Sequence, residues 1–313
     1  MERIATLALE PFSDPDRTLD GSSRARVGLR ALETLWFNTG TQCNLTCTNC
    51  YIESSPSNDR LAYLGVADVL PFLDEIAQLG LPVKTLGYTG GEPFLNPDFI
   101  DILELGLERG FDALVLTNGM RPMQQHAERL LELKARFGHR LSLRVSVDHF
   151  DPSLHREERG RQSWTPVLRG LRWLSQQGFD LSVAGRTRWG EAEPMLRAGF
   201  EQLFEREGLA VDAHDPSRLL LFPEMDPAAE VPEISTDCFG ILGVDPDSIM
   251  CASSRMVVRR RDAERPAVLA CTLLPYDARF ELGATLAESL GDVSLNHVHC
   301  ARFCVLGGGS CTA

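Results

Sequence analysis

Three cysteines in the first sixth of the chain have a spacing that can carry metal chemistry. Cys43, Cys47 and Cys50 form a C-x3-C-x2-C array on one short segment. Three thiolates spaced in this way can bind three irons of a [4Fe–4S] cube, and the fourth iron then stays open for another ligand. Structural zinc is the alternative, but it normally takes four protein ligands, and no fourth lies nearby in the sequence. The array therefore predicts an iron–sulfur cluster with one open coordination position.

A second group of cysteines lies near the end of the sequence. The chain has nine cysteines, and none falls between Cys50 and Cys238. The other six are Cys238, Cys251, Cys271, Cys300, Cys304 and Cys311. An odd number of cysteines cannot pair completely, and disulfides are uncommon in a reducing cytoplasm. Two separate groups of cysteines predict two metal sites.

The elements that must position these cysteines alternate along the chain from Thr34 onward. Short apolar or β-branched runs predict strands at 34–39, 83–88, 112–117, 141–147, 180–186 and 218–222. Helices are predicted at 98–109, 164–177 and 191–207. Apolar residues also recur at helical spacing in two further segments, at Val69, Phe72, Leu73, Ile76 and Leu79, and at Leu130, Leu133 and Phe137. Four of the helical segments are followed by a glycine, as helix ends often are: Gly80, Gly110, Gly138 and Gly178.

This alternation predicts an α/β fold with parallel strands and helical crossovers. Six units over about 190 residues fit a partial (β/α)6 barrel better than a closed eight-unit barrel, and a doubly wound open sheet is the alternative. In either fold, ligands bind at the carboxyl ends of the strands. The first cysteine array follows the first predicted strand directly, so we expect it at that end of the sheet.

The sequence suggests three regions. We expect an N-terminal extension over 1–33, the barrel core over 34–232 and a small cysteine-rich domain over 233–313. The last region should contain one hairpin near 247–270 and one helix near 281–290. Four arginines in the predicted hairpin form a basic patch, interpreted as a solvated face or as an anchor for an anionic group: Arg255, Arg259, Arg260 and Arg261.

Composition excludes several classes of protein. Hydrophobic residues make up 43% and charged residues 24% of the chain, as in ordinary globular proteins. The net charge of −13 argues against nucleic acid as a partner, because phosphate binding needs positive charge. No apolar run approaches the roughly 20 residues that span a bilayer, so no membrane partner is expected. The acidic, polar N-terminus is not a secretion signal, which indicates a cytoplasmic location.

Three of the other predicted strands are also followed by, or end in, short motifs of polar residues and glycines. Thr89-Gly90-Gly91-Glu92-Pro93 follows the second strand, Leu116-Thr117-Asn118-Gly119 ends the third, and Ser146-Val147-Asp148 ends the fourth. The segment from His155 to Gly160 comes next. With the cysteine array, this order of motifs resembles the radical S-adenosylmethionine (SAM) superfamily over most of the chain. The family usually has an aromatic residue just before the third cysteine, whereas this chain has Asn49 there and Tyr51 after the array.

The resemblance implies a SAM site at the strand ends. Gly90 and Gly91 let the backbone approach a ligand closely, and in the family this strip receives the amino group of SAM. The other implied contacts are Glu92, Asn118, Ser146, Arg186 and Tyr51, with Asp148 beside them. Each side chain has a simpler explanation as well: Glu92 as a turn carboxylate, Ser146 as a helix cap, Arg186 as a surface charge, and Asn118 and Asp148 as strand ends.

The C-terminal cysteines resemble the auxiliary-cluster domains called twitch and SPASM. In these domains a cysteine pair flanks a hairpin, and a later close pair completes a second [4Fe–4S] cluster. The resemblance implies one auxiliary cluster on Cys238, Cys251, Cys300 and Cys304. Cys271 is an alternative ligand, and Cys311 is a free tail thiol or a contact to iron or substrate. His297 and His299 flank Cys300, so zinc bound by cysteine and histidine is the other interpretation.

The resemblance implies reductive cleavage of SAM at the first cluster. The resulting 5′-deoxyadenosyl radical would take hydrogen from a small-molecule or peptide substrate, leading to oxidation or bond formation, and an electron donor such as flavodoxin or ferredoxin would feed the cluster. The implied enzyme is an oxidoreductase. Two other classes remain open at this point, a non-catalytic iron–sulfur electron carrier and a zinc-stabilised interaction protein. Electron transfer alone does not require the strand-end motifs, whereas SAM binding does.

Overall fold

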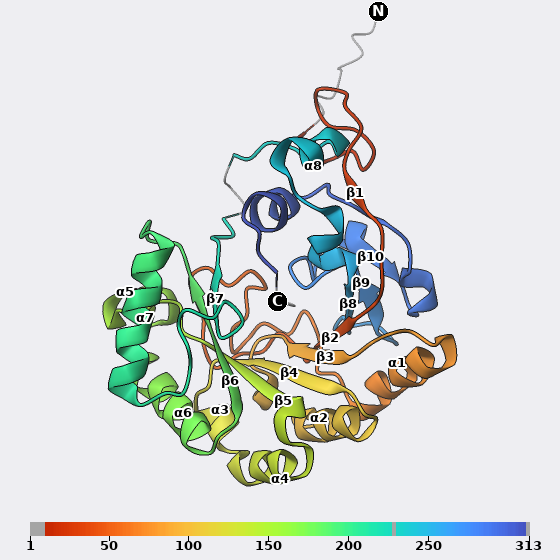
Figure 1. Cartoon of the computed structure of the whole chain (residues 1–313). Helices are drawn as coiled ribbons and strands as arrows, with labels where there is room; N and C mark the ends of the chain where they lie inside the picture. Colours follow the sequence, from red (N-terminus) through yellow and green to blue (C-terminus); the bar gives the residue numbers. More distant parts are fainter. Residues whose placement is uncertain (1–9, 227–229, 311–313) are drawn as a thin grey trace, which may run out of the picture.

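A computed structural model describes residues 10–226 and 230–310 of the chain. Its centre is a nine-stranded sheet with the order β10-β9-β8-β2-β3-β4-β5-β6-β7 (Figure 1). Strands β2 to β7 are parallel and are neighbours in chain order, so every crossover joins adjacent strands. The partial (β/α)6 barrel predicted from the sequence is confirmed, and the doubly wound alternative is wrong because the strand order never reverses.

The six core strands and the helices between them lie close to the predicted ranges. The strands are β2 (Thr34–Asn38), β3 (Thr85–Thr89), β4 (Asp112–Thr117), β5 (Leu141–Ser146), β6 (Asp180–Arg186) and β7 (Leu219–Phe222). The helices are α1 (Val66–Leu79), α2 (Phe99–Glu108), α3 (Arg121–Gln124), α4 (Ala127–Phe137), α5 (Pro152–Arg159), α6 (Trp164–Gln176) and α7 (Glu193–Glu207). The sequence analysis did not identify α3 and α5, which are only 4 and 8 residues long.

The sheet separates two hydrophobic cores. Leu35 and Phe37 of β2 point toward the helices and join the larger core. Trp36, between them, points to the other face and packs with the C-terminal segment. This alternation follows from the two-residue period of a strand and explains why β2 is apolar on both faces. Figure 1 shows helices α1 to α7 along the outer side of the curved sheet, with the C-terminal segment (blue) on the other side.

The C-terminal segment extends the barrel sheet. Strand β8 (Ser254–Val258) pairs in parallel with β2, and β9 (Ala267–Leu269) and β10 (Glu281–Gly283) follow as antiparallel neighbours. The predicted hairpin near 247–270 is confirmed as β8 and β9. The helix predicted near 281–290 is wrong, because β10 and a single 3-10 turn occupy that stretch.

Four short elements of the outer regions were not predicted. Strand β1 (Arg26–Val27) pairs with β11 (Val293–Ser294), which ties the N-terminal region to the C-terminal segment. Helix α8 spans Thr236–Leu242, and a π-helical turn, η7, spans Cys300–Leu306. Within the described residues, no helix is long and apolar enough to cross a membrane.

Candidate functional site

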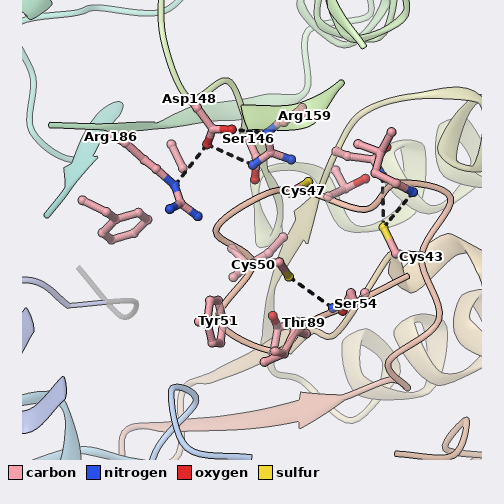
Figure 2. Close-up of a pocket in the computed structure, with 18 of the residues that line it drawn as sticks. Cys43, Cys47, Cys50, Tyr51, Ser54, Thr89, Ser146, Asp148, Arg159 and Arg186 are labelled. Atoms are coloured by element: carbon pink, nitrogen blue, oxygen red, sulfur yellow. Dashed lines mark hydrogen bonds and ion pairs between the residues drawn. The ribbon is translucent and has the colours of Figure 1, made fainter. Parts of the chain in front are cut away.

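A pocket opens at the carboxyl ends of the barrel strands, and the predicted site residues gather there (Figure 2). The three cysteines of the first array line one side of it. Residues from the ends of β3 to β6 line the rest of its floor. The predicted contacts that line this pocket are Tyr51, Gly90, Gly91, Asn118, Ser146 and Arg186. The carboxyl ends of parallel strands lie at one edge of the sheet, so site residues as far apart in sequence as Cys43 and Arg186 line the same pocket.

Backbone amides point at two of the cysteine sulfurs. The amide of Leu45 donates to Cys43 Sγ, and the amide of Ser54 donates to Cys50 Sγ, each at 3.4 Å. Burial raises the pKa of the Cys43 thiol to about 12. Burial thus disfavours a free thiolate at Cys43, whereas amide donors favour one and tune the sulfurs of iron–sulfur clusters, so this loop could hold the cysteines as metal ligands.

The end of helix α5 fixes the second half of the cysteine loop. The backbone amide and the side-chain amide of Asn49 donate to the two carboxylate oxygens of Glu158, at 2.8 and 2.9 Å. The amide of Thr48 donates to the Glu158 carbonyl at 2.9 Å. Glu158 is buried. Asn49, which stands where the family usually has an aromatic residue, therefore holds the loop in place through hydrogen bonds.

The two glycines after β3 lie directly against the cysteine loop. A Cβ on Gly91 would come within 2.1 Å of the Gln42 carbonyl oxygen, and Gly90 has a φ of +137°, which favours glycine. The amide of Gly91 donates to the Gly40 carbonyl at 2.9 Å. Larger residues at either position would push the loop away from the strand ends. The glycine pair thus sets the distance between the cysteines and the floor of the pocket.

A buried carboxylate holds two arginines at the other side of the pocket. Arg159 donates to both oxygens of Asp148 at 2.5 and 3.1 Å, and Arg186 Nε lies 3.4 Å from the same carboxylate. Burial alone would raise the pKa of Asp148, but the two guanidinium charges outweigh it and hold that pKa below its usual value. Arg186 Nη2 donates to the Asn49 carbonyl at 3.2 Å, so this arginine also braces the cysteine loop.

One guanidinium nitrogen in this pocket has no hydrogen bond. Arg186 Nη1 is buried and lacks a hydrogen-bond partner; its nearest acidic oxygen, on Glu158, lies 3.8 Å away. Figure 2 shows the Arg186 side chain reaching from the end of β6 toward the cysteine loop. A buried donor without an acceptor is costly, so this nitrogen is available to bind an anionic group.

Comparison with known proteins identifies the domain that carries this pocket. The family model of the radical SAM superfamily matches residues 37–187, the stretch that contains the cysteine loop and the strand ends from β3 to β6. The chain contains a radical SAM domain. Among solved structures, SuiB of Streptococcus suis bound to S-adenosylmethionine superposes with a TM-score of 0.58 at 11% identity, over 82% of this chain and 64% of SuiB. Native anSMEcpe with bound AdoMet also gives 0.58, at 15% identity, over 82% of this chain and 79% of that one.

Curated relatives match mainly this radical SAM stretch. The subtilosin biosynthesis protein AlbA of Bacillus subtilis is 29% identical over 53% of this chain and 35% of AlbA. An AdoMet-dependent heme synthase of Methanosarcina barkeri is 30% identical over 45% of this chain and 38% of that protein. The chain therefore matches less than half the length of each relative. Solved structures at 11–15% identity support the fold.

Glu92 of the radical SAM motif lies beneath the pocket instead of lining it. Its Oε1 accepts hydrogen bonds from the Thr117 hydroxyl at 2.8 Å and the Phe94 amide at 3.3 Å, and its Oε2 accepts one from the Asn118 amide at 2.8 Å. Burial raises the pKa of Glu92 to about 7 in spite of these bonds. The carboxylate joins the ends of β3 and β4 and so positions Asn118, whose side chain lies 3.9 Å from Cys43 Sγ.

Replacing Glu92 by alanine is expected to lower stability more than it changes chemistry at the cysteines. The Asn118 amide and the Thr117 hydroxyl would lose their acceptor, and a buried unsatisfied group costs about 1–3 kcal/mol. We expect the free energy of unfolding, measured with urea, to fall by about 2–4 kcal/mol. Glu92→Gln keeps one acceptor and serves as the control, with a smaller loss. Equal stability of the wild type and the alanine variant would contradict this structural role.

Apolar side chains from the C-terminal half close the far wall of the pocket. Phe222 ends β7, Met225 follows it, and Leu273 and Phe303 come from the C-terminal segment. The Phe222 and Phe303 rings pack with centroids 5.8 Å apart. Phe222 ends a predicted strand but carries no polar group that would mark it as part of a site. Nothing in the local pattern of Met225, Leu273 and Phe303 links them to the strand ends, so these residues were not predicted to line the pocket. Together the four side chains give the pocket an apolar wall.

Four C-terminal cysteines belong to the hydrophobic core around the β8–β9 hairpin. Cys251 precedes β8 and Cys271 follows β9, so these two flank the hairpin. Cys251 and Cys300 are buried in this core, and Cys271 and Cys304 pack against it. Burial raises the pKa of Cys300 well above its usual value. Cys304 lies one turn after Cys300 on η7.

Cys238 belongs to another element. It lies on α8 with its Sγ 3.4 Å from the Ser235 hydroxyl. Cys238 packs, half-buried, against the same hydrophobic core as Cys271 and Cys304. Cys311 lies outside the described residues.

The two histidines beside Cys300 pack with aromatic rings. The His297 ring lies 4.8 Å from that of His299 and 6.1 Å from that of Phe280. Over residues 10–226 and 230–310, no three Cys, His, Asp or Glu side chains form a group that could hold a metal ion.

Proposed function

We propose that this protein cleaves SAM reductively at a [4Fe–4S] cluster bound by Cys43, Cys47 and Cys50. The observation that carries the proposal is that these cysteines, the Gly90–Gly91 strip and Arg186 line one pocket at the strand ends. When bound, the reduced cluster supplies the electron that cleaves SAM, and the resulting radical takes a hydrogen atom from the substrate. The comparisons support this chemistry through the matched radical SAM stretch.

The residues of the pocket fit these groups. Among its described lining residues, the three cysteines have neither a fourth cysteine nor a histidine beside them, so one iron would stay open for SAM. Arg186 Nη1, which has no hydrogen-bond partner, suits the carboxylate of SAM. The glycine strip offers backbone groups to the amino end, and Ser146 and Tyr51 line the same pocket. Tyr51 supplies an aromatic face for adenine in place of the residue at Asn49.

Arg186→Gln is expected to weaken SAM binding. A charge-assisted hydrogen bond is worth about 1.5–3 kcal/mol, so we expect the dissociation constant to rise roughly 10- to 150-fold, measured by equilibrium dialysis of the iron-loaded protein. Arg188→Gln is the matched control, because Arg188 forms ion pairs with Glu158 and Glu224 and does not line the pocket. Equal SAM affinity in Arg186→Gln and the wild type, with both proteins folded, would remove Arg186 from the site.

A second cluster is proposed on Cys251, Cys271, Cys300 and Cys304. The hairpin that such a cysteine pair should flank lies between Cys251 and Cys271, which supports Cys271 in place of the predicted Cys238. Cys251 and Cys300 are buried, and Cys271 and Cys304 are half-buried in the same hydrophobic core. Leu273 and Phe303, each next to a proposed ligand or two residues from one, line the SAM pocket. A cluster there would lie near the substrate and could accept its electron, giving net oxidation.

The region boundaries and partners belong to the same proposal. Residues 34–232 would form the catalytic core, and 233–313 would carry the auxiliary cluster. The substrate is a small molecule or a peptide: SuiB has been solved bound to a precursor peptide, whereas another relative is a GTP 3′,8-cyclase of Shewanella denitrificans. An electron donor such as flavodoxin or ferredoxin would reduce the first cluster.

A direct assay tests the proposed function. Protein reconstituted with iron and sulfide without oxygen is mixed with SAM and dithionite, and 5′-deoxyadenosine and methionine are measured by mass spectrometry. We expect both products in equal amounts even without substrate, because cleavage needs only the cluster, SAM and an electron. Iron-loaded, SAM-binding protein that forms neither product would favour an electron carrier instead.

A further inference from the structure

Arg255 on β8 is a fully buried positive charge. Its exposed fraction is 0%. The guanidinium donates only to backbone carbonyls: Nε to Ser289 at 2.8 Å, Nη1 to Cys251 at 2.6 Å and Ser254 at 2.8 Å, and Nη2 to Gly291 at 2.9 Å. Arginine stays protonated in proteins, so a full charge lies inside the C-terminal core.

The other arginines of the hairpin each have an acidic partner. Arg259 lies 2.9 Å from Asp68, Arg260 lies 2.7 Å from Glu281, and Arg261 lies 3.0 Å from Asp59. The basic patch considered from the sequence is therefore three ion pairs and one buried arginine. Arg255 has no carboxylate within ion-pair distance in the described part of the chain.

An isolated buried charge is expensive, and buried charges are normally paired. Two of the cysteines proposed as cluster ligands lie beside Arg255. Its Nη1 donates to the carbonyl of Cys251, and Cys271 follows the strand that pairs with β8, with Met256 opposite Leu269. With both cysteines as neutral thiols, the guanidinium would have no counter-charge.

We propose that Arg255 is a positioning residue that balances the charge of the auxiliary cluster and raises its reduction potential. The inference rests on the auxiliary cluster of the proposed function. Thiolates that bind iron at Cys251 and Cys271 supply the missing negative charge. Reduction adds one electron, and so one more negative charge, to the cluster, and a buried cation stabilises the reduced form more than the oxidised form. Arg255 thereby favours electron acceptance at this site.

The test uses full-length protein in which Cys43, Cys47 and Cys50 are all alanine, so that the remaining iron reports the second site. Its reduction by dithionite is followed by electron paramagnetic resonance at set potentials. In Arg255→Gln we expect the ratio of reduced to oxidised cluster at a fixed potential to fall roughly tenfold. This corresponds to a reduction potential lower by about 59 mV for a one-electron couple. Arg255→Lys keeps the positive charge, so its cluster should have a reduction potential close to that of the parent protein. Arg260→Gln removes an exposed charge from the same hairpin, and its potential should also stay near that of the parent.

The outcomes separate this inference from the proposal beneath it. If the triple alanine parent binds no iron, the proposal of an auxiliary cluster is wrong, and no arginine variant is needed to show this. An iron-loaded parent with an unchanged potential in Arg255→Gln means that Arg255 only ties together backbone carbonyls. If Arg255→Gln does not fold, Arg255→Lys decides: a potential near that of the parent, despite fewer hydrogen bonds, supports the charge role. If the reduction potential of Arg255→Lys falls as far as that expected for Arg255→Gln, the charge role of Arg255 is wrong.

Discussion

Alanine at Cys43, Cys47 or Cys50 is expected to reduce 5′-deoxyadenosine formation to the level of a reaction without enzyme. Each cysteine would bind one iron of the cube, and no other cysteine or histidine lines the described pocket to replace it. Loss of one ligand removes the electron source for SAM cleavage, so substrate and reductant cannot compensate. Product is measured by mass spectrometry with dithionite as reductant, under the conditions used for the wild type.

The control for these variants is Cys238→Ala. Cys238 is a half-buried cysteine outside the pocket and outside the proposed second ligand set. This variant should cleave SAM like the wild type. Circular dichroism should show that all four variants keep their fold, because the cysteine loop is also held by Glu158 and by the glycine strip. Full SAM cleavage by the triple variant would contradict the assignment of the first cluster.

The core strands could be predicted from the sequence because burial on both faces leaves a strong local signal. The predicted ranges 112–117 and 180–186 coincide with β4 and β6. A parallel strand covered by helices on one face and by other side chains on the other must be apolar almost throughout. The helices between them show one apolar stripe and often end at glycine, as α1 does at Gly80 with its φ of +62°.

Contacts distant in sequence explain what the local pattern missed at the C-terminus. The stretch 281–290 has a helix-like composition, but Glu288 accepts hydrogen bonds from the Ala284 and Thr285 amides and closes a tight turn. Glu75 of α1 accepts from the next two amides, of Leu286 and Ala287. These bonds satisfy donors that a helix would have used. The pairing of β8 with β2, about 220 residues apart, likewise has no local signature.

The candidate site was predictable where residues follow strands directly, and less so where side-chain direction decides. Cysteines and glycines at strand ends had to meet in any parallel barrel. Glu92 also follows a strand end, yet its side chain turns inward to Thr117 and Asn118. The role of Glu158 depends on a short helix returning to the cysteine loop, which no spacing in the sequence indicates. The sequence thus locates the pocket but does not distinguish the residues that line it from those, such as Glu92 and Glu158, that hold the lining residues in place.

Iron analysis is expected to show two clusters and to identify the ligands of the second. Wild-type protein reconstituted without oxygen should hold eight irons, because each cube has four. The triple alanine variant of the first array should keep four and remain brown. In that background, Cys271→Ala should lose the remaining cluster, whereas Cys238→Ala should keep it. The physical reason is position: Cys251 and Cys271 flank the same hairpin, and both lie at the hydrophobic core that contains Cys300.

The opposite pattern has an equally clear meaning. If Cys238→Ala loses the iron and Cys271→Ala keeps it, the ligand set is the one that the sequence alone suggested. If neither single change removes the iron, the fourth ligand of the cube is another residue, with Cys311 the first to replace. Binding of one zinc and no iron by the triple variant would make the C-terminal segment a structural zinc module. The electron of a substrate radical would then need another acceptor.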